Sequence, residues 1–484
     1  MVRSPLVLRS DPGRVIVRPF LPGQELLADG RSRVDAVVDR VLAMAPSDVA
    51  ATLADTLAIF ADRHDDLHAV FAKHYALVAA AVETGEVSED QALLIGSYVT
   101  QEYALEAAAL FNPSMVTHPD QDGLADGELR FLMSVRSVGE GHISSIQLRT
   151  GVLGASGTEL RIDPPGPPQL PEHRPASLPR AVLLAALAER TDARADQLNG
   201  LVPERVDPDN LDQVLATVRH EYFDPTRGVA TSEQLRWVYS CDYGADVPAG
   251  RPIANTVLFP AAPDERNGME DARLTRLVED DGRVGYHATY TAYDGSHIAS
   301  HLISTADFRQ FEVRQLLGPA SKSKGMALFP RRVGGDYTAL VRWDRESIAV
   351  ARSRDLRWWN RAVTVQQPHA AWELIQLGNC GPPVETEAGW LVLNHGVGPV
   401  RRYGIGAILL DLDDPTVLRG VLPEPLLLPN EDERIGYVPN VVYSCGALRH
   451  GNTLVLPYGC SDSSIRFAFV DLPALLDRLT TSRP

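Results

Sequence analysis

The spacing of apolar residues separates a helical first part of the chain from a largely β remainder. Between about 31 and 110, apolar positions recur every three or four residues, as in SDVAATLADTLAIFADRH. This spacing places them on one face of a helix, and Ser47 and Ser88 precede such stretches as candidate N-caps. We therefore predict an α-helical N-terminal unit over residues 1–110.

After Phe111 the pattern changes to short alternating runs with Gly, Asp and Asn between them, for example LRFLMSVRSVGEGHISSIQLRTG. Such alternation is typical of antiparallel strands. A proline-rich stretch at 163–175 leads into a second helical patch that ends before about 230. We interpret this patch as a helical insertion, over about 160–235, within a β domain that spans 111–484.

A repeat organises the β part. Four similar segments begin at Asn267, Gly325, Gly381 and Tyr437, which are 58, 56 and 56 residues apart. Most contain a strand, a polar turn, a second strand and a third strand rich in small residues. Two of them end in the same corner, Ser/Thr-x-Asp-apolar-x-x-aromatic, at 305–311 and 353–359.

β units of this size at a near-constant period are typical of propeller blades, and residues 111–151 supply one more unit. The predicted fold is mainly β, a five-bladed β-propeller with an α-helical N-terminal unit and a helical insertion after the first blade. A β-sandwich with coincidental spacing is the alternative, but it does not explain the repeated corner.

Composition narrows the function classes. Hydrophobic residues make up 44% of the 484 and charged residues 23%, and the formal net charge of −17 repels nucleic acid and anionic membranes. Any anion that binds must therefore meet a local cluster of basic residues. No apolar stretch has the length of a signal peptide core or a membrane span, so we expect a cytoplasmic protein. The four cysteines have no CxxC spacing and are expected to be buried thiols: Cys241, Cys380, Cys445 and Cys460.

The innermost strands of propeller blades face a common axis, so residues far apart in sequence can meet in one pocket. The blade starts and inner strands supply charged groups of both signs, which a plain structural axis would not need. The candidates are Asn112, Arg136, Glu270, Asp271, Arg273, Lys324, Arg342, His395, Tyr403, Asn440 and Asp462.

Several of these residues lie in a series of motifs that resembles glycoside hydrolase family 130, the inverting β-mannoside phosphorylases and β-1,2-mannosidases. The resemblance covers about 111–157 and 250–472, with the motifs at blade spacing, and it implies a five-bladed propeller. The motifs are GMEDARLTRL, TYTAYDG, KGMALFPRRV, GPPVETEAGWLVLNHGV, YGIGAILLDLDDP, YVPNVVYSCGAL and YGCSD.

The resemblance implies that Asp271 is the general acid, which protonates the glycosidic oxygen through the 3-hydroxyl of the mannosyl residue. An acid on one face of the sugar and a nucleophile on the other give inversion. To hold its proton near neutral pH, such an acid needs a raised pKa, and we expect the adjacent Glu270 to help raise it. Without the motif series, Asp271 would more simply be a turn carboxylate.

The resemblance also places phosphate among basic and phenolic groups, Lys324, Arg342, His395 and Tyr403, since a buried dianion must be paired. Taken singly, these could be surface charges or a core histidine. The chain departs from the family pattern at three positions. Ala272 stands where Pro is common, and Gly325 stands where Asp is frequent. Gly404, after Tyr403, stands where the family often has Arg. The missing cation at 404 leaves hydrolysis open.

Sugar hydroxyls require donors and acceptors around them, and Trp343 or Tyr293 could stack on a sugar face. Asp462, in YGCSD, matches the mannose-binding Asp of the family. The predicted substrate-binding residues are Asn112, Arg136, Glu270, Arg273, Tyr290, Asp294, Asn440 and Asp462.

The sequence thus predicts an inverting phosphorylase that converts a β-mannoside oligosaccharide and inorganic phosphate into α-mannose 1-phosphate. A β-1,2-mannosidase and a non-catalytic glycan-binding propeller are the alternatives. No metal or dinucleotide motif is present, and we predict no cofactor. The amphipathic N-terminal helices must bury their apolar faces, so we expect a homo-oligomer.

Overall fold

The computed structural model describes residues 1–23, 26–27, 30–79, 87–191, 195–222 and 225–481. The chain divides into two compact units, a smaller one of Asp11–Ala107 and a larger one of Met1–Ser10 with Ala108–Pro484. The predicted boundary at 110 lies close to this division, but the first ten residues do not belong to the helical unit. They form a strand that pairs within the larger unit.

In its described residues, the smaller unit contains four α-helices and a two-stranded antiparallel sheet. Ser88 caps its helix as predicted, with a capping box to Gln91, whereas Ser47 is not a cap. The helix there begins at Pro46, because proline suits the first turn, and Ser47 already lies inside it. Residues 80–86, part of the predicted helical stretch, lie outside the described residues. The bounds are α1 Arg33–Leu42, α2 Pro46–Phe60, α3 Leu67–Val78, α4 Glu89–Tyr98, β2 Val15–Pro19 and β3 Thr100–Ala104.

Apolar faces of these helices meet in the middle of the smaller unit, where Val49, Leu94 and Ile95 are almost fully buried. Among the described residues, no single helix is long and apolar enough to cross a membrane. Helices α1 and α2 reach the required length and composition only together, and they are bent by 118° at their junction.

The larger unit is built from successive antiparallel meanders. The first two meanders share an eleven-stranded sheet, because Gly268 of β13 pairs in parallel with Ser144 of β6. Its strands are β4 Ala109–Thr117, β5 Leu129–Val138, β6 Ser144–Leu153, β7 Leu160–Ile162, β8 Glu172–Pro175, β11 Tyr243–Asp246, β12 Val257–Leu258, β13 Gly268–Val278, β14 Val284–Tyr293, β15 Ile298–Thr305 and β16 Gln310–Gln315.

Three further sheets follow the repeat that the sequence showed. The third is β17 Ala327–Leu328, β18 Tyr337–Val341, β19 Ile348–Ser353 and β20 Ala362–Gln366. The fourth is β21 Gln376–Asn379, β22 Val384–Thr386, β23 Gly389–Val397, β24 Tyr403–Leu410 and β25 Leu418–Val421. The last is β26 Val442–Tyr443, β27 Leu448–His450, β28 Thr453–Cys460 and β29 Ser464–Asp471 with β1 Val2–Arg9.

The repeated corner has a physical cause. At the first copy, Thr305 Oγ1 accepts from Phe308 N at 2.9 Å and Asp307 Oδ1 accepts from Gln310 N at 3.0 Å, so the turn supplies its own hydrogen bonds. The apolar residue adopts a left-handed backbone, with φ of 56° at Phe308 and 63° at Leu356 in the second copy. The aromatic residue that ends each corner then packs into the core, as Trp359 does with no exposed surface.

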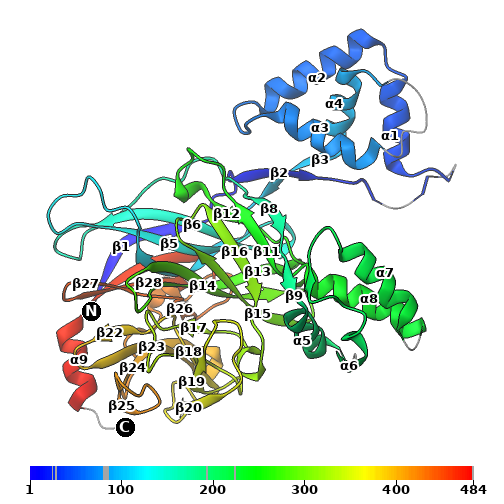
Figure 1. The fold of residues 1–484 in the computed structure, drawn as a ribbon. Helices are drawn as coiled ribbons and strands as arrows, with labels where there is room; N and C mark the ends of the chain where they lie inside the picture. The colour runs from blue at the N-terminus through cyan, green and yellow to red at the C-terminus, as the bar shows by residue number, and fades with distance from the viewer. Residues whose placement is uncertain (24–25, 28–29, 80–86, 192–194, 223–224, 482–484) are drawn as a thin grey trace. The chain divides into compact units, whose positions relative to one another are not determined.

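The predicted helical insertion has its own apolar core, in which Leu183, Val218 and Leu235 are fully buried. Its helices, drawn in green, gather at one side of the β sheets (Figure 1). They are α5 Arg180–Arg190, α6 Ala195–Leu198, α7 Leu211–Glu221 and α8 Pro225–Tyr239, with a short ladder of β9 Leu178–Pro179 and β10 Arg205–Val206; α9 Leu472–Thr481 follows the last strand. The short 3₁₀ turns are η2 Glu140–His142, η3 Ile253–Asn255, η4 Pro263–Glu265, η5 Pro319–Ser321, η6 Pro399–Arg401 and η7 Glu431–Glu433.

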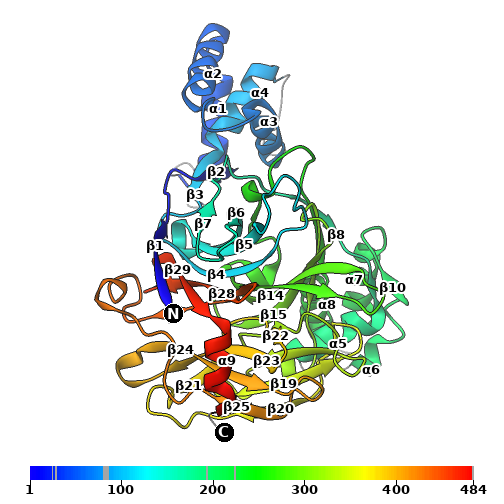
Figure 2. The same ribbon diagram turned by 90° about the vertical axis from the view of Figure 1, so that its left-hand side faces the viewer.

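The two ends of the larger unit meet in one sheet. β1 pairs antiparallel with β29, from Val2 opposite Phe469 to Arg9 opposite Ser464. Figure 2 shows the blue first strand beside the red last one. The prediction of a mainly β protein is confirmed, and the four cysteines are free and buried, as expected.

Candidate active site

Two irregular strands shape the centre of the candidate site. The ladder between β13 and β14 breaks between Glu270 and Arg273, and Asp271 has a φ of 57°. The ladder between β4 and β5 breaks at Asn112, whose φ is 49°. Neighbouring side chains of a regular strand point to opposite faces, and a bulge changes that direction. The bulge therefore lets the adjacent carboxylates Glu270 and Asp271 contact the same side chain, that of Arg136.

Both carboxylates contact one guanidinium group. Arg136 Nη2 lies 2.7 Å from Glu270 Oε1, and its Nη1 lies 3.1 Å from Asp271 Oδ1. Asn112 Nδ2 donates to Asp271 Oδ1 at 2.7 Å, and Lys324 Nζ lies 2.7 Å from Glu270 Oε2. Five of the predicted residues thus form one largely buried hydrogen-bonded cluster.

The charges around Asp271 contradict one expectation. Burial raises the pKa of this carboxyl, but Arg136 and Arg273, with smaller contributions from Asn112 and Lys324, outweigh it and lower the pKa to about 2. The expected net rise beside Glu270 is therefore not found, and Glu270 itself is paired with Arg136 and Lys324. Asp271 is therefore ionised at neutral pH when the pocket holds no substrate.

Asp462 shows the opposite behaviour. It follows β28 in a turn with left-handed backbone at Ser461 and Asp462. Burial, followed by the nearby charges of Asp271 and Glu270, raises its pKa to about 6 against the opposing effect of Arg136 and Arg401. The pocket thus contains one carboxyl that is readily ionised and one that stays protonated under mildly acidic conditions.

A second cluster lies on the other side of Arg273. This fully buried guanidinium donates through Nη1 to the Asp271 carbonyl at 3.1 Å and through Nη2 to the Tyr443 hydroxyl at 2.7 Å. The His395 ring centre lies 4.7 Å from that of Tyr443 and 6.0 Å from that of Tyr403. Arg273 therefore links the acid cluster to the aromatic group.

Arg342 joins this second cluster through a glycine. A Cβ atom at Gly378 would lie 2.5 Å from His395 Cε1 and 3.4 Å from Arg342 Nη1, so both side chains lie against the bare backbone there. Burial, with Arg342 and Arg273 nearby, holds the pKa of His395 well below its usual value. A neutral His395 can accept as well as donate hydrogen bonds. The structure thus brings together Arg342, His395 and Tyr403, and Lys324 meets Glu270 beside them.

Two departures from the family pattern have a steric explanation. A Cβ at Gly404 would lie 2.8 Å from Leu428 Cδ2, so a larger side chain there would require Leu428 to shift. Gly325 has a φ of 89°, a conformation that favours glycine over Asp. Arg273, which the sequence assigned to sugar binding, is a further cation of the cluster.

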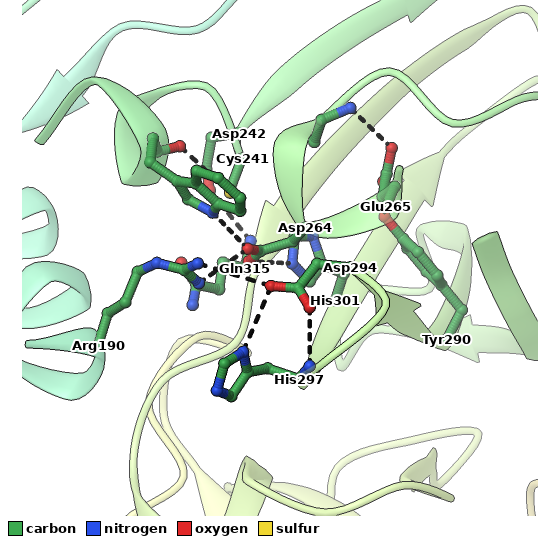
Figure 3. Close-up of polar contacts among 12 residues, drawn as sticks. Arg190, Cys241, Asp242, Asp264, Glu265, Tyr290, Asp294, His297, His301 and Gln315 are labelled. Carbon is green, nitrogen blue, oxygen red and sulfur yellow. Dashed lines mark hydrogen bonds and ion pairs between the residues drawn. The ribbon is translucent and has the colours of Figure 1, made fainter. Parts of the chain in front are cut away.

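Three predicted substrate-binding residues make hydrogen bonds outside the cluster around Asp271. The Tyr290 hydroxyl donates to Glu265, beside which Figure 3 shows it, and the Tyr290 ring packs in an apolar core cluster. Asp294 Oδ1 accepts from the backbone N of Ser296 at 2.8 Å and orders a loop. Asn440 Oδ1 accepts from Arg434 Nε at 2.8 Å.

Of the aromatic candidates for stacking on a sugar, Trp343 is 49% exposed, and the Tyr293 ring centre lies 5.9 Å from Lys324 Nζ. Sequence reasoning missed Tyr443 and Arg401. Tyr443 lies in β26, the first strand of the last repeat, so a comparison of corresponding strands across the repeats could have found it. Arg401 lies in a turn with left-handed backbone, and no sequence pattern indicates that it approaches Asp462. In the described part of the chain, no group of three or more His, Cys, Asp or Glu side chains could hold a metal ion.

Comparison with known proteins identifies the family. A family model described as beta-1,4-mannooligosaccharide phosphorylase, of glycoside hydrolase family 130, matches residues 251–481. A 1,2-beta-oligomannan phosphorylase from a Thermoanaerobacter species is 31% identical over 212 residues, which are 43% of this chain and 70% of that protein. The chain belongs to glycoside hydrolase family 130. A beta-1,2-mannobiose phosphorylase from Listeria innocua serovar 6a is 33% identical over 230 residues, 46% of this chain.

The chain spans 63% of the length of the Listeria enzyme. The solved structure of a beta-1,2-mannobiose phosphorylase from Listeria innocua with beta-1,2-mannobiose has a TM-score of 0.46 and 22% identity, covering 78% of this chain and 94% of that one. The family 130 match includes Asp271, Lys324 and Asp462 but begins after Asn112 and Arg136. These two residues are placed beside Asp271 by the fold alone.

Proposed function

We propose that this protein is an inverting β-mannoside phosphorylase, which cleaves a β-mannoside with inorganic phosphate to give α-mannose 1-phosphate and a shorter sugar. One observation carries the proposal. The backbone carbonyl of Asp271 accepts from Arg273, which links this residue to a cluster that also holds Arg342, His395 and Tyr443. In a chain of net charge −17, so many basic and phenolic groups in one buried place suit a bound anion.

The relatives support this reading. The Thermoanaerobacter and Listeria proteins are both named as phosphorylases of β-mannosides. No observation in the cluster favours water over phosphate as the nucleophile.

In the proposed reaction, a phosphate oxygen attacks the anomeric carbon from the side opposite the leaving oxygen, and the C–O bond to the leaving sugar breaks. Asp271 gives its proton, through the 3-hydroxyl as the family resemblance implies, to the leaving oxygen. Arg342, His395 and Tyr403 hold the phosphate, and Lys324 balances its charge at the edge of the acid cluster. The configuration at the anomeric carbon is inverted.

This scheme requires a proton on a carboxyl whose pKa is about 2 in the free site. Bound phosphate acts in the required direction, because a dianion beside Arg273 and Lys324 offsets their part of the positive field at Asp271, while the part from Arg136 remains. We infer that phosphate binding raises the pKa of Asp271 and so prepares the acid for its role.

For the fold, we infer that the five meanders are the blades of a five-bladed propeller. The sheets follow one another along the chain at a near-constant period, and a strand from the beginning of the chain completes the last sheet. Such an arrangement places the start of β13, the segment before β17 and the end of β23 near one axis, which accounts for the meeting of Asp271, Lys324 and His395.

The deciding experiment is an assay with β-1,2- and β-1,4-linked mannosides, with and without phosphate, in which all products are identified. We expect α-mannose 1-phosphate, formed only when phosphate is present. Free mannose released equally fast in phosphate-free buffer would contradict the proposal.

The acid is tested by Asp271→Asn, which should lower turnover roughly a hundredfold to ten-thousandfold, the usual contribution of general acid catalysis. Asp281→Asn, in the exposed turn of the same hairpin, is the control and should retain activity. A folded Asp271→Asn protein with the activity of the parent would exclude Asp271 as the acid.

A further inference from the structure

A cavity of about 940 Å³ adjoins the candidate active site. The helical insertion lines one part of it, through Arg190 at the end of α5 and Gln234 of α8, and the β sheets contribute Asp294, Ser296, Lys324 and Arg342. Lys324 is also the residue that contacts Glu270 beside the acid. The cavity therefore extends from the immediate neighbourhood of Asp271 to helix α5.

The part of the cavity wall that the insertion forms is held in place by an ion pair, hydrogen bonds and a ring contact of Arg190. Arg190 Nη1 lies 3.0 Å from Asp264 Oδ1, its Nε donates to Gln234 Oε1 at 3.0 Å, and its guanidinium carbon lies 4.2 Å from the Trp237 ring centre. Trp237 Nε1 donates to the same Asp264 oxygen at 2.5 Å. Figure 3 shows Arg190 reaching from its helix toward Asp264 and Asp294. A wall held by these contacts keeps its position before any ligand binds, which limits the entropic cost of binding.

The lining suits a sugar chain better than an apolar ligand. Besides the charged groups, it includes the hydroxyls of Ser296 and Ser300 and the amides of Gln234 and Gln315. Asp294 Oδ2 lies 3.6 Å from Arg190 Nη2 and 3.5 Å from His297 Nδ1, which is longer than ordinary hydrogen bonds. This oxygen therefore has acceptor capacity left for a hydroxyl group.

The size of the cavity also exceeds what the reaction centre needs. Ligand sites typically measure roughly 300–1,000 Å³, so this cavity lies near the upper end of the range. Phosphate is small, and its proposed ligands Arg342 and Lys324 occupy only one part of the lining. The remainder has room for more than one sugar ring.

We propose that this cavity binds the leaving part of the mannoside, and that Arg190 and Gln234 of the helical insertion form, together with Asp294 after β14, a second leaving-sugar position. The insertion ends before residue 251, where the family match begins. The family core then supplies the reaction chemistry, and the insertion selects substrates whose leaving part has at least two sugars. The inference rests on the proposed phosphorylase function.

The test uses the reverse reaction of the full-length protein, in which α-mannose 1-phosphate is offered with β-linked acceptors of one, two and three mannose units. Released phosphate is measured. We expect kcat/KM to rise roughly tenfold or more from one unit to two, as two or more added hydrogen bonds would give. Ser296→Trp, at an exposed position of the lining, should remove this rise and leave the single-unit acceptor within about twofold of the parent.

Ser156→Trp is the matched control, because Ser156 lies in the exposed turn between β6 and β7 and does not line the cavity. Gln234→Ala provides a milder second variant in case the tryptophan disturbs its loop, and it should lower the two-unit to one-unit ratio without changing the KM for phosphate. A flat length dependence in the parent protein, or one that both variants retain, overturns the inference. A changed KM for phosphate with unchanged length dependence does the same.

Failure of the proposed function would look different, since no acceptor of any length would then react. In that case, calorimetric titration with the same oligosaccharides, without phosphate, decides the matter. Affinity that rises with length and falls in Ser296→Trp supports the leaving-sugar position, and equal affinity in the two proteins refutes it.

Discussion

Left-handed backbone recurs at the residues that form the candidate site. The φ angles are 49° at Asn112, 57° at Asp271 and 49° at Asp462. Asn and Asp adopt this conformation more readily than other residues with a side chain, and such irregular positions collect at functional sites. Here the irregularity has a visible effect, because it directs Asp271 and Glu270 to the same guanidinium group of Arg136.

Lys324 is the cation most easily tested, because it is not fully buried. Lys324→Ala should raise the KM for phosphate roughly ten- to a hundredfold, since a charge-assisted contact contributes about 1.5–3 kcal/mol. The KM for the mannoside should change little. Steady-state kinetics with each substrate varied in turn measures both values. Lys73→Ala, at an exposed position of α3, is the control, and an unchanged phosphate KM in Lys324→Ala would remove this residue from the phosphate site.

The raised pKa of Asp462 gives a pH dependence with a definite sign. Below about pH 6 the carboxyl is protonated, and above it the carboxylate can accept two hydroxyl hydrogen bonds from mannose. Mannoside affinity should therefore rise as the pH increases from 5 to 7. Calorimetric titration without phosphate measures it, and Asp462→Asn should abolish the dependence. A parent protein whose affinity is constant over this range would contradict the assignment.

Ionisation of the Asp462 carboxyl, which should favour mannoside binding, lowers the stability of the folded protein. The folded-state pKa of this carboxyl, about 6, exceeds its ordinary 3.8, so ionisation is less favourable in the folded protein. This cost is absent below about pH 4 and complete above about pH 6. Asp271 behaves conversely, because its lowered pKa makes a stabilising contribution that is lost as the pH falls from 4 toward 2.

The residues of the site were easier to predict than their electrostatics. Motifs located Asp271, Lys324 and His395, because each motif has a fixed place in the repeat. The sign of the Asp271 pKa depends on Arg136, which lies 135 positions away in sequence, and on the bulge that brings them together. Tyr290 illustrates the same limit, since a residue near the site in sequence can face the core.

Among the elements, the repeat predicted the order of the sheets because each unit carries its own turn signals, as at Thr305 and Asp307. β1 could not be predicted in this way. Val2–Arg9 has no partner nearby in sequence and pairs with a strand at the other end of the chain. The helical insertion was predicted from its periodicity, but its contact with the cavity depends on side chains such as Arg190.

The helices of the smaller unit bear on self-association, which stays a prediction. Three large apolar side chains on its helices are solvent-exposed, Ile59 by 66%, Leu77 by 57% and Tyr98 by 47%. We expect a second copy of the chain to cover them. Sedimentation should show an oligomer that Ile59→Glu with Leu77→Glu converts to monomer, whereas Val363→Glu, at an exposed position of β20, leaves it intact. A parent protein that is monomeric at every concentration would contradict this expectation.

At the scale of the whole molecule, the net charge of the chain is negative, whereas the candidate site gathers basic groups. The net charge of −17 repels phosphate, so the basic groups around Arg273 must provide the attraction locally. Salt screens the long-range repulsion more strongly than contacts inside a buried cluster.

The strand pairing across the ends of the larger unit also makes a prediction. Deletion of residues 1–9 should lower the melting temperature, because it exposes the edge of β29 and removes the contacts of Arg3 with Glu433, one of them at 3.1 Å. Thermal unfolding of the shortened chain measures the effect. Arg3→Ala alone should cause a smaller loss. An unchanged melting temperature in the shortened chain would show that β1 contributes nothing to stability.

The same pairing has a consequence for biosynthesis. β1 is synthesised before the rest of the larger unit, and its partner β29 is among the last elements of that unit to emerge from the ribosome. Domains generally fold as units during translation. The smaller unit, Asp11–Ala107, can therefore form while β1 still has no partner strand. Until residue 471 has been made, the nascent chain carries an unpaired edge strand at its beginning, which is open to pairing with other chains. Ribosome-bound chains that end before Ser464 should therefore be cleaved by proteases near their N-terminus, and released full-length chains should resist.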